Sequence, residues 1–335
     1  ETAKTKCLIT SVHPELSVVF CSFFSRISLV FKLLRSRCKG YSRHLSPIEI
    51  LCVRQDEEKS LSTGPLGLTG DYAEGYSAEL LHPMPRAEGR GAVGLNVGLD
   101  SALPLLGRDL WTGYEFSWLN LKGKPVVAGL KINVDCASTN IVESKSMKLY
   151  LNGFAQTQFV DAHAVSARLN DDLHSAFDGG VVVDLTPIDE LAGQWASMQG
   201  QCLDELDIQV TEYQRAPELL GQMSGGSHVV TEHLYTHLFR SLCPVTAQPD
   251  WASVVVSYTG NAIDHAGLLG YLISYRCHQA FHETTIERIY ADIMAACQPT
   301  FLSVNGRFQR RGGLDINPFR CSEECPVLDV RMPRQ

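Results

Sequence analysis

One short stretch of the chain carries residue types that could do covalent chemistry. In CPVTAQPDW, residues 243–251, Cys243 is followed seven residues later by Asp250. Pro244 and Pro249 bracket the stretch, and proline lacks an N–H and pushes its predecessor toward extended geometry, so neither a helix nor a central strand is expected to run through it. The residues themselves leave open whether Cys243 is a buried thiol or a nucleophile held in a loop.

A catalytic role for Cys243 would need help from other residues. The thiolate is the reactive form, and a free cysteine has a pKa of about 8.5. Asp250 alone would disfavour the thiolate by like-charge repulsion. The carboxyl is more useful as a group that gives and takes protons for a substrate, while a His or Lys elsewhere supplies positive charge. A raised pKa of Asp250 would suit this role.

A second group of polar residues lies near position 280. It consists of His278, His282, Glu283 and Glu287. If a single helix carried the two histidines, they would share one face, as a metal site requires, but Gln279 stands where the HExxH zinc pattern needs Glu. A solvated helix face is the plain explanation. The functional alternative is that Glu283 accepts hydrogen bonds from a guanine-like ring.

ESKSMKLY, residues 143–150, begins a predicted helix. Glu143 near the helix start suits the macrodipole, so capping alone explains it. Lys145 and Lys148 are three residues apart and can share one face, which is the minimum for gripping a phosphate.

Two glycine-containing segments could also approach a phosphate. RRGGLDINPFR, residues 310–320, places Arg310 and Arg311 beside two glycines, which predicts a basic turn. GRGAVG, residues 89–94, matches the dinucleotide fingerprint GxGxxG. That motif works between a strand and a helix, and neither is predicted on its two sides, so we assign it no cofactor.

The composition indicates a folded protein with a small-molecule partner. The chain has 335 residues, 44% of them hydrophobic, which is enough for two domains. Its formal net charge is −8 without long basic runs, so no nucleic-acid partner is expected. The 11 cysteines are odd in number and widely spread, which predicts reduced thiols in a cytoplasm. Cys321 and Cys325 form a lone CxxxC pair, so no structural metal is expected.

The first part of the chain differs from the rest. Residues 16–40 are apolar and basic, but Arg26 and Lys32 interrupt them, so they fall short of the roughly 20 apolar residues of a membrane span. A targeting segment or an interfacial helix is one interpretation. We expect residues 1–59 to be an N-terminal extension that is not part of the core, and no membrane partner.

Hydrophobic periodicity predicts an α+β protein. Its predicted elements are a hairpin at 111–136, helices at 143–159 and 161–177, strands at 181–188, 202–214, 229–243 and 251–260, helices at 264–280 and 282–297, and a strand at 301–311. The segment 229–243 is ambiguous and could also be helical. Consecutive helices imply an antiparallel sheet, so we expect one ββααββ unit used twice.

Four blocks together resemble one known family. ESKSMKLYLNGF, CPVTAQPDW, FHE at 281–283 and RRGGLDINP are similar to the NADPH-dependent 7-cyano-7-deazaguanine reductases, the QueF family, in its long two-module form. The resemblance covers roughly residues 60–335. It implies tandem tunnelling-fold (T-fold) modules, each ββααββ with an antiparallel sheet and two helices on one face, at 60–222 and 223–335. Ala247 stands where many members carry Gly.

The resemblance also implies a reaction. Members convert a nitrile to an aminomethyl group with two NADPH per substrate, on the route to the modified tRNA base queuosine. Cys243 would form a covalent thioimide and Asp250 would protonate the nitrogen. The substrate is a free base rather than tRNA, and the enzyme is expected to be a cytoplasmic homodimer without a metal.

The binding residues implied by the resemblance come from four segments. The deazaguanine would be held by Val142, Glu143, Ser144, His282 and Glu283. NADPH would be held by Ser144, Lys145, Arg311 and Gly312. Two other classes stay open, namely a zinc-dependent cyclohydrolase of the same fold and a purine-binding module without catalysis.

Overall fold

The computed structural model describes residues 75–95, 103–191, 197–223, 229–327, 329–332 and 335. All of them belong to one unit, Asp56–Gln335. The extension predicted at residues 1–59 lies outside the described residues.

Strands and helices alternate in short groups along the described chain. The strands are β1 (Pro83–Pro85), β2 (Leu106–Leu119), β3 (Pro125–Asp135), β4 (Asn140–Val142), β5 (Val181–Pro187), β6 (Gln201–Cys202), β7 (Val229–Thr236), β8 (Arg240–Leu242), β9 (Pro249–Asn261), β10 (Phe301–Phe308) and β11 (Leu314–Cys321). The α-helices are α2 (Arg86–Ala92), α3 (Ser144–Phe154), α4 (Ala162–Phe177), α5 (His265–Ser274) and α6 (His282–Cys297).

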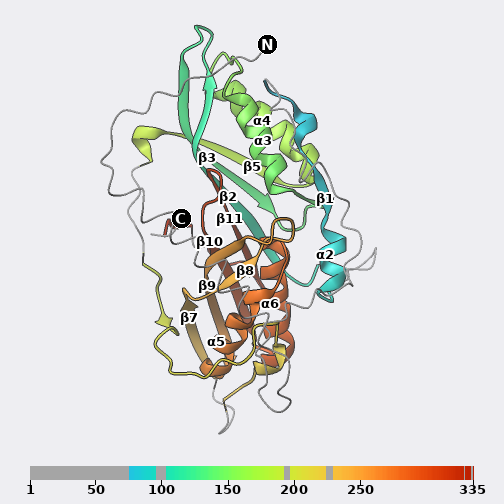
Figure 1. Ribbon diagram of the computed structural model, residues 1–335, viewed down its shortest axis with the longest axis vertical. Helices are drawn as coiled ribbons and strands as arrows, with labels where there is room; N and C mark the ends of the chain where they lie inside the picture. Colours follow the sequence, from blue (N-terminus) through green and yellow to red (C-terminus); the bar gives the residue numbers. More distant parts are fainter. Residues whose placement is uncertain (1–74, 96–102, 192–196, 224–228, 328, 333–334) are drawn as a thin grey trace, which may run out of the picture. The chain divides into compact units, whose positions relative to one another are not determined.

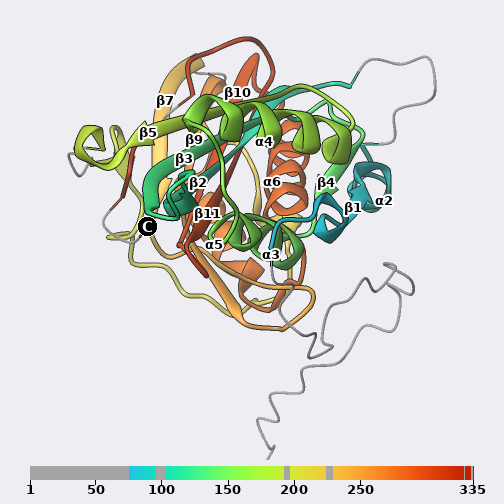
Figure 2. The ribbon, with the colours of Figure 1, turned by 90° about the horizontal axis from the view of Figure 1, so that it is seen from above.

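One large sheet joins most of these strands. Its order is β5-β3-β2-β11-β10-β9-β7-β6, and β8 also pairs with β9 (Figure 1). Neighbouring strands are antiparallel except β6 and β7, which are parallel. Strands β1 and β4 form a separate small sheet, and α2, which follows β1, contacts α6 (Figure 2). The α+β class with antiparallel sheets therefore agrees with the prediction.

The predicted hairpin is formed by β2 and β3. The Asn120 carboxamide oxygen accepts hydrogen bonds from the backbone N–H groups of Lys122 and Lys124, and Gly123 donates to the Asn120 carbonyl at 2.8 Å. Gly123 has φ of 77°, which few other residues adopt without strain. These local bonds reverse the chain and fix the register of the two strands.

The helices cover one face of the large sheet in two groups. Trp111 of β2 opposes Ile316 of β11 and packs among buried side chains of α3 and α4. Val304 of β10 opposes Arg320 of β11 and packs among side chains of α5 and α6. Ile316 and Arg320 are an even number of residues apart on β11, so both helical layers lie on the same face.

The prediction of a strand at 202–214 is wrong. Only β6 pairs with the sheet, through two residues beside β7. The Asp204 carboxylate then accepts hydrogen bonds from the Thr236 hydroxyl, at 2.6 Å, and from the His237 backbone N–H, which turns the chain away from the sheet. Among the described residues, the first half therefore contributes β2, β3 and β5 to one side of the large sheet and only the two-residue β6 to its opposite edge. The long fourth strand of the predicted ββααββ unit is not formed.

The segment 310–320 is only partly the predicted turn. Residues from Leu314 onward form β11, which lies between β10 and β2 near the middle of the sheet. Pro318 within it opposes Asp109 of β2. Proline is rare in central strands because it cannot donate to the ladder, so the sequence pattern pointed away from a strand here.

The predicted helix at 264–280 ends early. Helix α5 stops at Ser274, a short 3-10 turn covers Tyr275–Cys277, and His278 is extended. A new helix, α6, begins at His282. His278 and His282 therefore do not share a helix face, which corrects the arrangement expected for the two histidines.

Candidate functional site

Cys243 lies in a tight loop between β8 and β9. Its N–H donates to the Gln248 carbonyl and its carbonyl accepts from the Ala247 N–H, both at 2.9 Å. Ala247 has φ of 53°, in the left-handed region that favours glycine, which gives a physical sense to the glycine common at this position in the resembling family. Cys243 is partly exposed, so its thiol is accessible rather than sealed in the core.

Asp250 lies inside β9 and is almost fully buried. Arg311 donates a short hydrogen bond from Nη1 to Asp250 Oδ1, and His282 Nε2 lies 3.4 Å from Asp250 Oδ2. Burial by itself would raise the pKa of Asp250, but the hydrogen bonds and charges of His282 and Arg311 outweigh it and hold the pKa below the usual range. The raised pKa that would suit an acid is therefore not found in this geometry, which favours the carboxylate form of Asp250.

The imidazole of His282 is held on three sides. It stacks on Phe308 with 3.8 Å between ring centroids and 6° between planes. Its Nδ1 lies 3.3 Å from the Ile316 carbonyl oxygen, while Nε2 faces Asp250. A carbonyl oxygen can only accept a hydrogen bond. The ring therefore donates from Nδ1, which turns Nε2 toward the Asp250 carboxylate.

Glu283 begins the first turn of α6 and is 4% exposed. It lines a cavity of about 450 Å³ together with Ile141, Pro244 and Phe281. Burial, followed by the charge of Asp109, raises the pKa of Glu283. Within the described chain its carboxylate has no hydrogen bond to another side chain, so it is available to N–H donors of a ligand.

The start of α3 supplies backbone and side-chain donors. Glu143 is the N-cap, and its carboxylate accepts from the N–H groups of Lys145 and Ser146, both at 2.8 Å. The capping explanation is thus confirmed, and the carboxylate keeps acceptor capacity for a ligand. Val142 is buried at the end of β4, while Ser144 is half-buried and Lys145 is exposed.

The turn at residues 311–313 lies against α3. Gly312 has φ of 61°, and a Cβ there would lie 3.2 Å from Lys148 Cδ and 3.8 Å from its Nζ. Lys148 is half-buried and, among the described residues, has neither an ion pair nor a hydrogen bond. The charges of Arg311, Glu143, Cys243 and Asp250 all act on it. Lys148 thus belongs to the site, which its pairing with Lys145 at three-residue spacing only hinted at.

These cationic groups fit a phosphate-bearing cofactor such as NADPH. Lys145 is exposed and the Arg311 side chain is 27% exposed. The Lys148 side chain has no ion pair within the described residues. Gly312 lets the backbone approach closely because it has no side chain. We find the four residues expected to hold NADPH on two neighbouring segments, α3 and the turn before β11.

Arg310, the neighbour of Arg311, points elsewhere. Its guanidinium pairs with Glu115 at 3.0 Å and lies over the Tyr114 ring, 4.9 Å from the centroid. The two adjacent arginines therefore have different partners, and only Arg311 reaches Asp250.

A buried ion-pair network that no sequence motif indicated supports this region. Arg320 of β11 bonds Asp109 at 2.8 Å and Glu287 at 3.0 Å, with none of its side chain exposed. Glu287 also pairs with Arg90 of α2, and Asp109 with Arg86. Glu287, one turn after Glu283, is thus structural, and the network ties α2, β2, β11 and α6 together.

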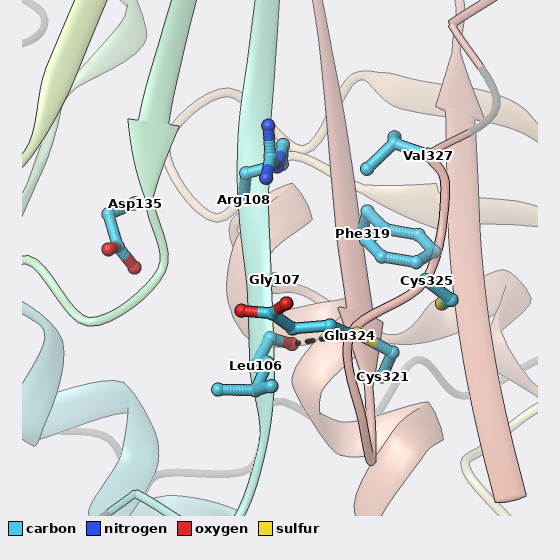
Figure 3. Close-up of a pocket in the computed structure, with 9 residues that line it drawn as sticks. All are labelled: Leu106, Gly107, Arg108, Asp135, Phe319, Cys321, Glu324, Cys325 and Val327. Carbon is cyan, nitrogen blue, oxygen red and sulfur yellow. Dashed lines mark hydrogen bonds between the residues drawn. The ribbon is translucent and has the colours of Figure 1, made fainter.

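A second pocket, of about 460 Å³, lies at the ends of β2 and β11 (Figure 3). Cys321 and Cys325 both line it, and Cys321 Sγ is 3.7 Å from the Leu106 carbonyl. Burial, followed by the neighbouring Cys325, raises the pKa of Cys321 to about 12. High pKa values make these thiols poor nucleophiles, and none of the predicted site residues lines this pocket.

Two further findings concern the described part of the chain. No group of three or more His, Cys, Asp or Glu side chains there is arranged to hold a metal ion. None of the helices there combines the length and hydrophobicity that crossing a bilayer requires.

Comparison with known families matches both halves of the chain. Residues 72–185 match the family described as "Nitrile reductase, 7-cyano-7-deazaguanine-reductase N-term". Residues 249–326 match the family described as "QueF-like protein".

Curated relatives extend the match over most of the chain. A protein of Dechloromonas aromatica (strain RCB) is 49% identical over 268 residues, covering 79% of this chain and 92% of the relative. One of Bordetella avium (strain 197N) is 47% identical over 281 residues, covering 82% and 99%. Both are named NADPH-dependent 7-cyano-7-deazaguanine reductase.

Among solved structures, apo archaeosine synthase QueF-Like is 18% identical to this chain. The match covers 31% of this chain and 100% of that one, with a TM-score of 0.25, which establishes no shared fold.

Proposed function

Because the chain belongs to the NADPH-dependent 7-cyano-7-deazaguanine reductase family, we propose that it reduces the nitrile of 7-cyano-7-deazaguanine to the aminomethyl group of 7-aminomethyl-7-deazaguanine. Membership makes it an oxidoreductase with NADPH as cofactor. The observation that carries the proposal is one constellation. Pro244, next to the partly exposed Cys243, and Glu283, next to the His282 that pairs with Asp250, line the same cavity.

The first step uses Cys243 as the nucleophile. The thiolate sulfur bonds to the nitrile carbon, the C≡N bond becomes C=N, and the nitrogen takes a proton, which gives a covalent thioimide. The partly exposed Cys243 at the loop is suited to this attack, and Pro244, the next residue, lines the Glu283 cavity. Because Asp250 rests as a carboxylate, it first takes up a proton through the contact with His282 Nε2 and then gives this proton to the nitrogen.

The later steps require hydride and further protons. When bound, NADPH supplies a hydride to the former nitrile carbon, once to the thioimide and once to the imine that forms after the thiolate leaves. Asp250 and His282 deliver the protons that balance these additions, and Cys243 is regenerated as the sulfur–carbon bond breaks. The complete reaction consumes two NADPH and two protons per nitrile.

Recognition of the base is assigned to the cavity side of the site. Glu283 accepts from the ring N–H and amino groups, supported by its burial and its lack of a side-chain partner within the described residues. His282, Val142, Glu143 and Ser144 complete the substrate site. Four residues are assigned to NADPH binding, namely Ser144, Lys145, Arg311 and Gly312.

We propose two tunnelling-fold modules, at residues 60–222 and 223–335, in a homodimer. The repeated order of two strands, two helices and a further strand in each half supports this division. The reaction belongs to the biosynthesis of queuosine, and the cytoplasm suits a catalytic thiolate because its redox buffer keeps thiols reduced. Light scattering of the eluting protein measures the dimer directly, and a monomer mass at working concentration would exclude it.

The test of the chemistry is mass spectrometry of protein mixed with the nitrile and no cofactor. We expect a mass increase of one substrate on the peptide that carries Cys243. Cys243→Ala should bind the base but form no adduct and consume no NADPH, because the nucleophile is gone. Cys202→Ala, which removes another partly exposed thiol, is the matched control and should behave as wild type. Normal turnover by Cys243→Ala contradicts the proposal.

A further inference from the structure

Arg311 occupies a position between the acid of the site and its surroundings. Nη1 donates to Asp250, Nη2 donates to Gln248 Oε1 at 2.5 Å, and the backbone N–H is tied to Leu314 O at 2.8 Å. The Asp250 side chain is 3% exposed, whereas that of Arg311 is 27% exposed. One terminal nitrogen therefore holds the buried acid and the other holds Gln248, while the exposed part of the side chain can be reached by an anion that competes for them.

The turn that carries Arg311 lies against a lysine suited to binding phosphate, and the charge of Arg311 acts on that lysine. Gly312 beside Arg311 packs on Lys148, and Lys145 lies on the same helix, α3. A phosphate placed here would take hydrogen bonds from Arg311 together with the lysines. It would compete with the Asp250 carboxylate for the same guanidinium.

We propose that Arg311 is a positioning residue that couples cofactor binding to acid catalysis: a cofactor phosphate that engages Arg311 releases Asp250 from its ion pair and makes Asp250 a competent proton donor. This inference rests on the proposed function, since it assigns the cofactor to the same site. The coupling explains how Asp250 can act as an acid although His282 and Arg311 lower its pKa.

The direction of the effect follows from the charges around Asp250. His282 from α6 and Arg311 from the turn before β11 act directly on Asp250. Lys148 from α3 adds a further cation, and the charges of Glu143 and Cys243 act on that lysine together with Asp250. Drawing Arg311 toward a phosphate removes stabilisation of the carboxylate, and the phosphate adds negative charge nearby. Both changes raise the pKa of Asp250, so the protonated acid persists to higher pH.

Thioimide formation isolates this step because it needs no hydride. The sulfur of Cys243 bonds to the nitrile carbon, one π bond of the nitrile is lost, and the nitrogen gains the proton that the acid loses. No electron donor takes part, so the oxidised cofactor NADP⁺ can be present without turnover. The rate of adduct formation should fall as the pH rises through the pKa of the acid.

The experiment measures the pH profile of adduct formation with and without NADP⁺, by stopped mixing and mass spectrometry. In the wild type, NADP⁺ should move the falling limb to higher pH by about one unit or more, the size expected for loss of an opposite charge in contact. In Arg311→Met the limb should already be shifted, and NADP⁺ should move it little. NAD⁺ in a parallel series shows whether the 2′-phosphate or the pyrophosphate is the group engaged.

Arg310→Met is the matched control, since Arg310 pairs with Glu115 and not with Asp250, and it should keep the wild-type response. Arg311→Lys keeps a positive charge and provides a second variant should Arg311→Met not fold. It should shift the falling limb of the pH profile by an intermediate amount. Asp250→Asn should lose the falling limb of the pH profile, because the titrating acid is gone. An Arg311→Met profile identical to wild type, or a wild-type limb that ignores NADP⁺, overturns the coupling. Absence of any adduct in the wild type instead removes the proposed function.

Discussion

Two glutamates four residues apart on α6 have opposite electrostatic surroundings. Burial and the charge of Asp109 raise the pKa of Glu283. Burial acts in the same direction on Glu287, but the cations Arg320 and Arg90 outweigh it and lower its pKa. Position on the helix is thus a poor guide to protonation, because the partners come from strands and helices distant in sequence.

This contrast predicts opposite effects of removing each charge. Glu283→Gln should stabilise the fold increasingly as the pH rises from about 4 toward 7, because a raised pKa costs stability once the unfolded chain ionises. It should also weaken substrate binding by roughly tenfold or more, since a charged acceptor is lost. Thermal melts across this pH range and titration with the nitrile base provide the measurement.

Glu287→Gln is the matched comparison. A lowered pKa stabilises the fold above the unfolded pKa and loses that stabilisation as the pH falls, so this change should destabilise at neutral pH by roughly 3 kcal/mol or more. Its deficit should shrink in acid. If the melting temperatures of the two variants changed with pH in the same way, the opposite pKa shifts assigned to Glu283 and Glu287 would be refuted.

The sequence located the site better than it described its electrostatics. The proline-bracketed loop indicated Cys243 and Asp250 as candidates, and the polar residues near position 280 indicated Glu283; their roles stay predictions. The lowered pKa of Asp250 could not be predicted, because Arg311, 61 residues away, approaches it only in the fold. Lys148 had no distinguishing pattern beyond its spacing from Lys145.

Among the elements, the turn at residues 311–313 is the one whose backbone shape decides what can bind. Gly312 combines φ of 61° with close contact to Lys148. Its lack of a side chain serves both requirements. The neighbouring Gly313, at φ of 87°, continues the left-handed turn into β11.

We predict that Gly312→Ala destabilises the protein by about 1–2 kcal/mol, the cost of a side chain in left-handed geometry. It should also raise the KM for NADPH, because the added methyl group displaces Lys148 from the phosphate side. Differential scanning calorimetry and steady-state kinetics check the two effects. Gly221→Ala is the control, since a Cβ there meets no atom within 4 Å. Equal behaviour of the two variants would contradict this role.

Element prediction succeeded where local periodicity agreed with the tertiary structure. The helices α3, α4 and α6 lie where apolar residues at helical spacing placed them, and the hairpin has its own turn signal. The strand prediction for residues 202–214 failed because the Asp204 carboxylate accepts a hydrogen bond from the His237 N–H, and the chain at Asp204 does not pair with a strand. Strand β11 was missed because Pro318 and the glycines before it favour turns, while eight pairs with β2 stabilise the strand.

At the scale of the whole described unit, one strand unites the two halves. Strand β11 belongs to the second half in sequence but pairs with β2 of the first along its entire length. Arg320 on this strand bonds Asp109 of β2 and Glu287 of α6 within the buried interior. The proposed modules thus share a continuous sheet and a common ion network.

We therefore expect the two halves to unfold together, in a single calorimetric transition. Arg320→Met should lower stability by roughly 3–5 kcal/mol, because Asp109 and Glu287 lose a buried partner, while keeping one transition. Arg331→Met, at a position outside that network, is the control and should have a smaller effect. Two separate transitions in the wild type would show that the halves are energetically independent.

The late position of β11 has a consequence for synthesis on the ribosome. Strand β2, more than 190 residues earlier, is made with one hydrogen-bonding edge lacking its native neighbour until residues 314–321 leave the exit tunnel. An open edge of this kind readily recruits strands from other nascent chains. Slow translation or early termination before this point should therefore send the polypeptide toward aggregates rather than toward a half-sized folded product.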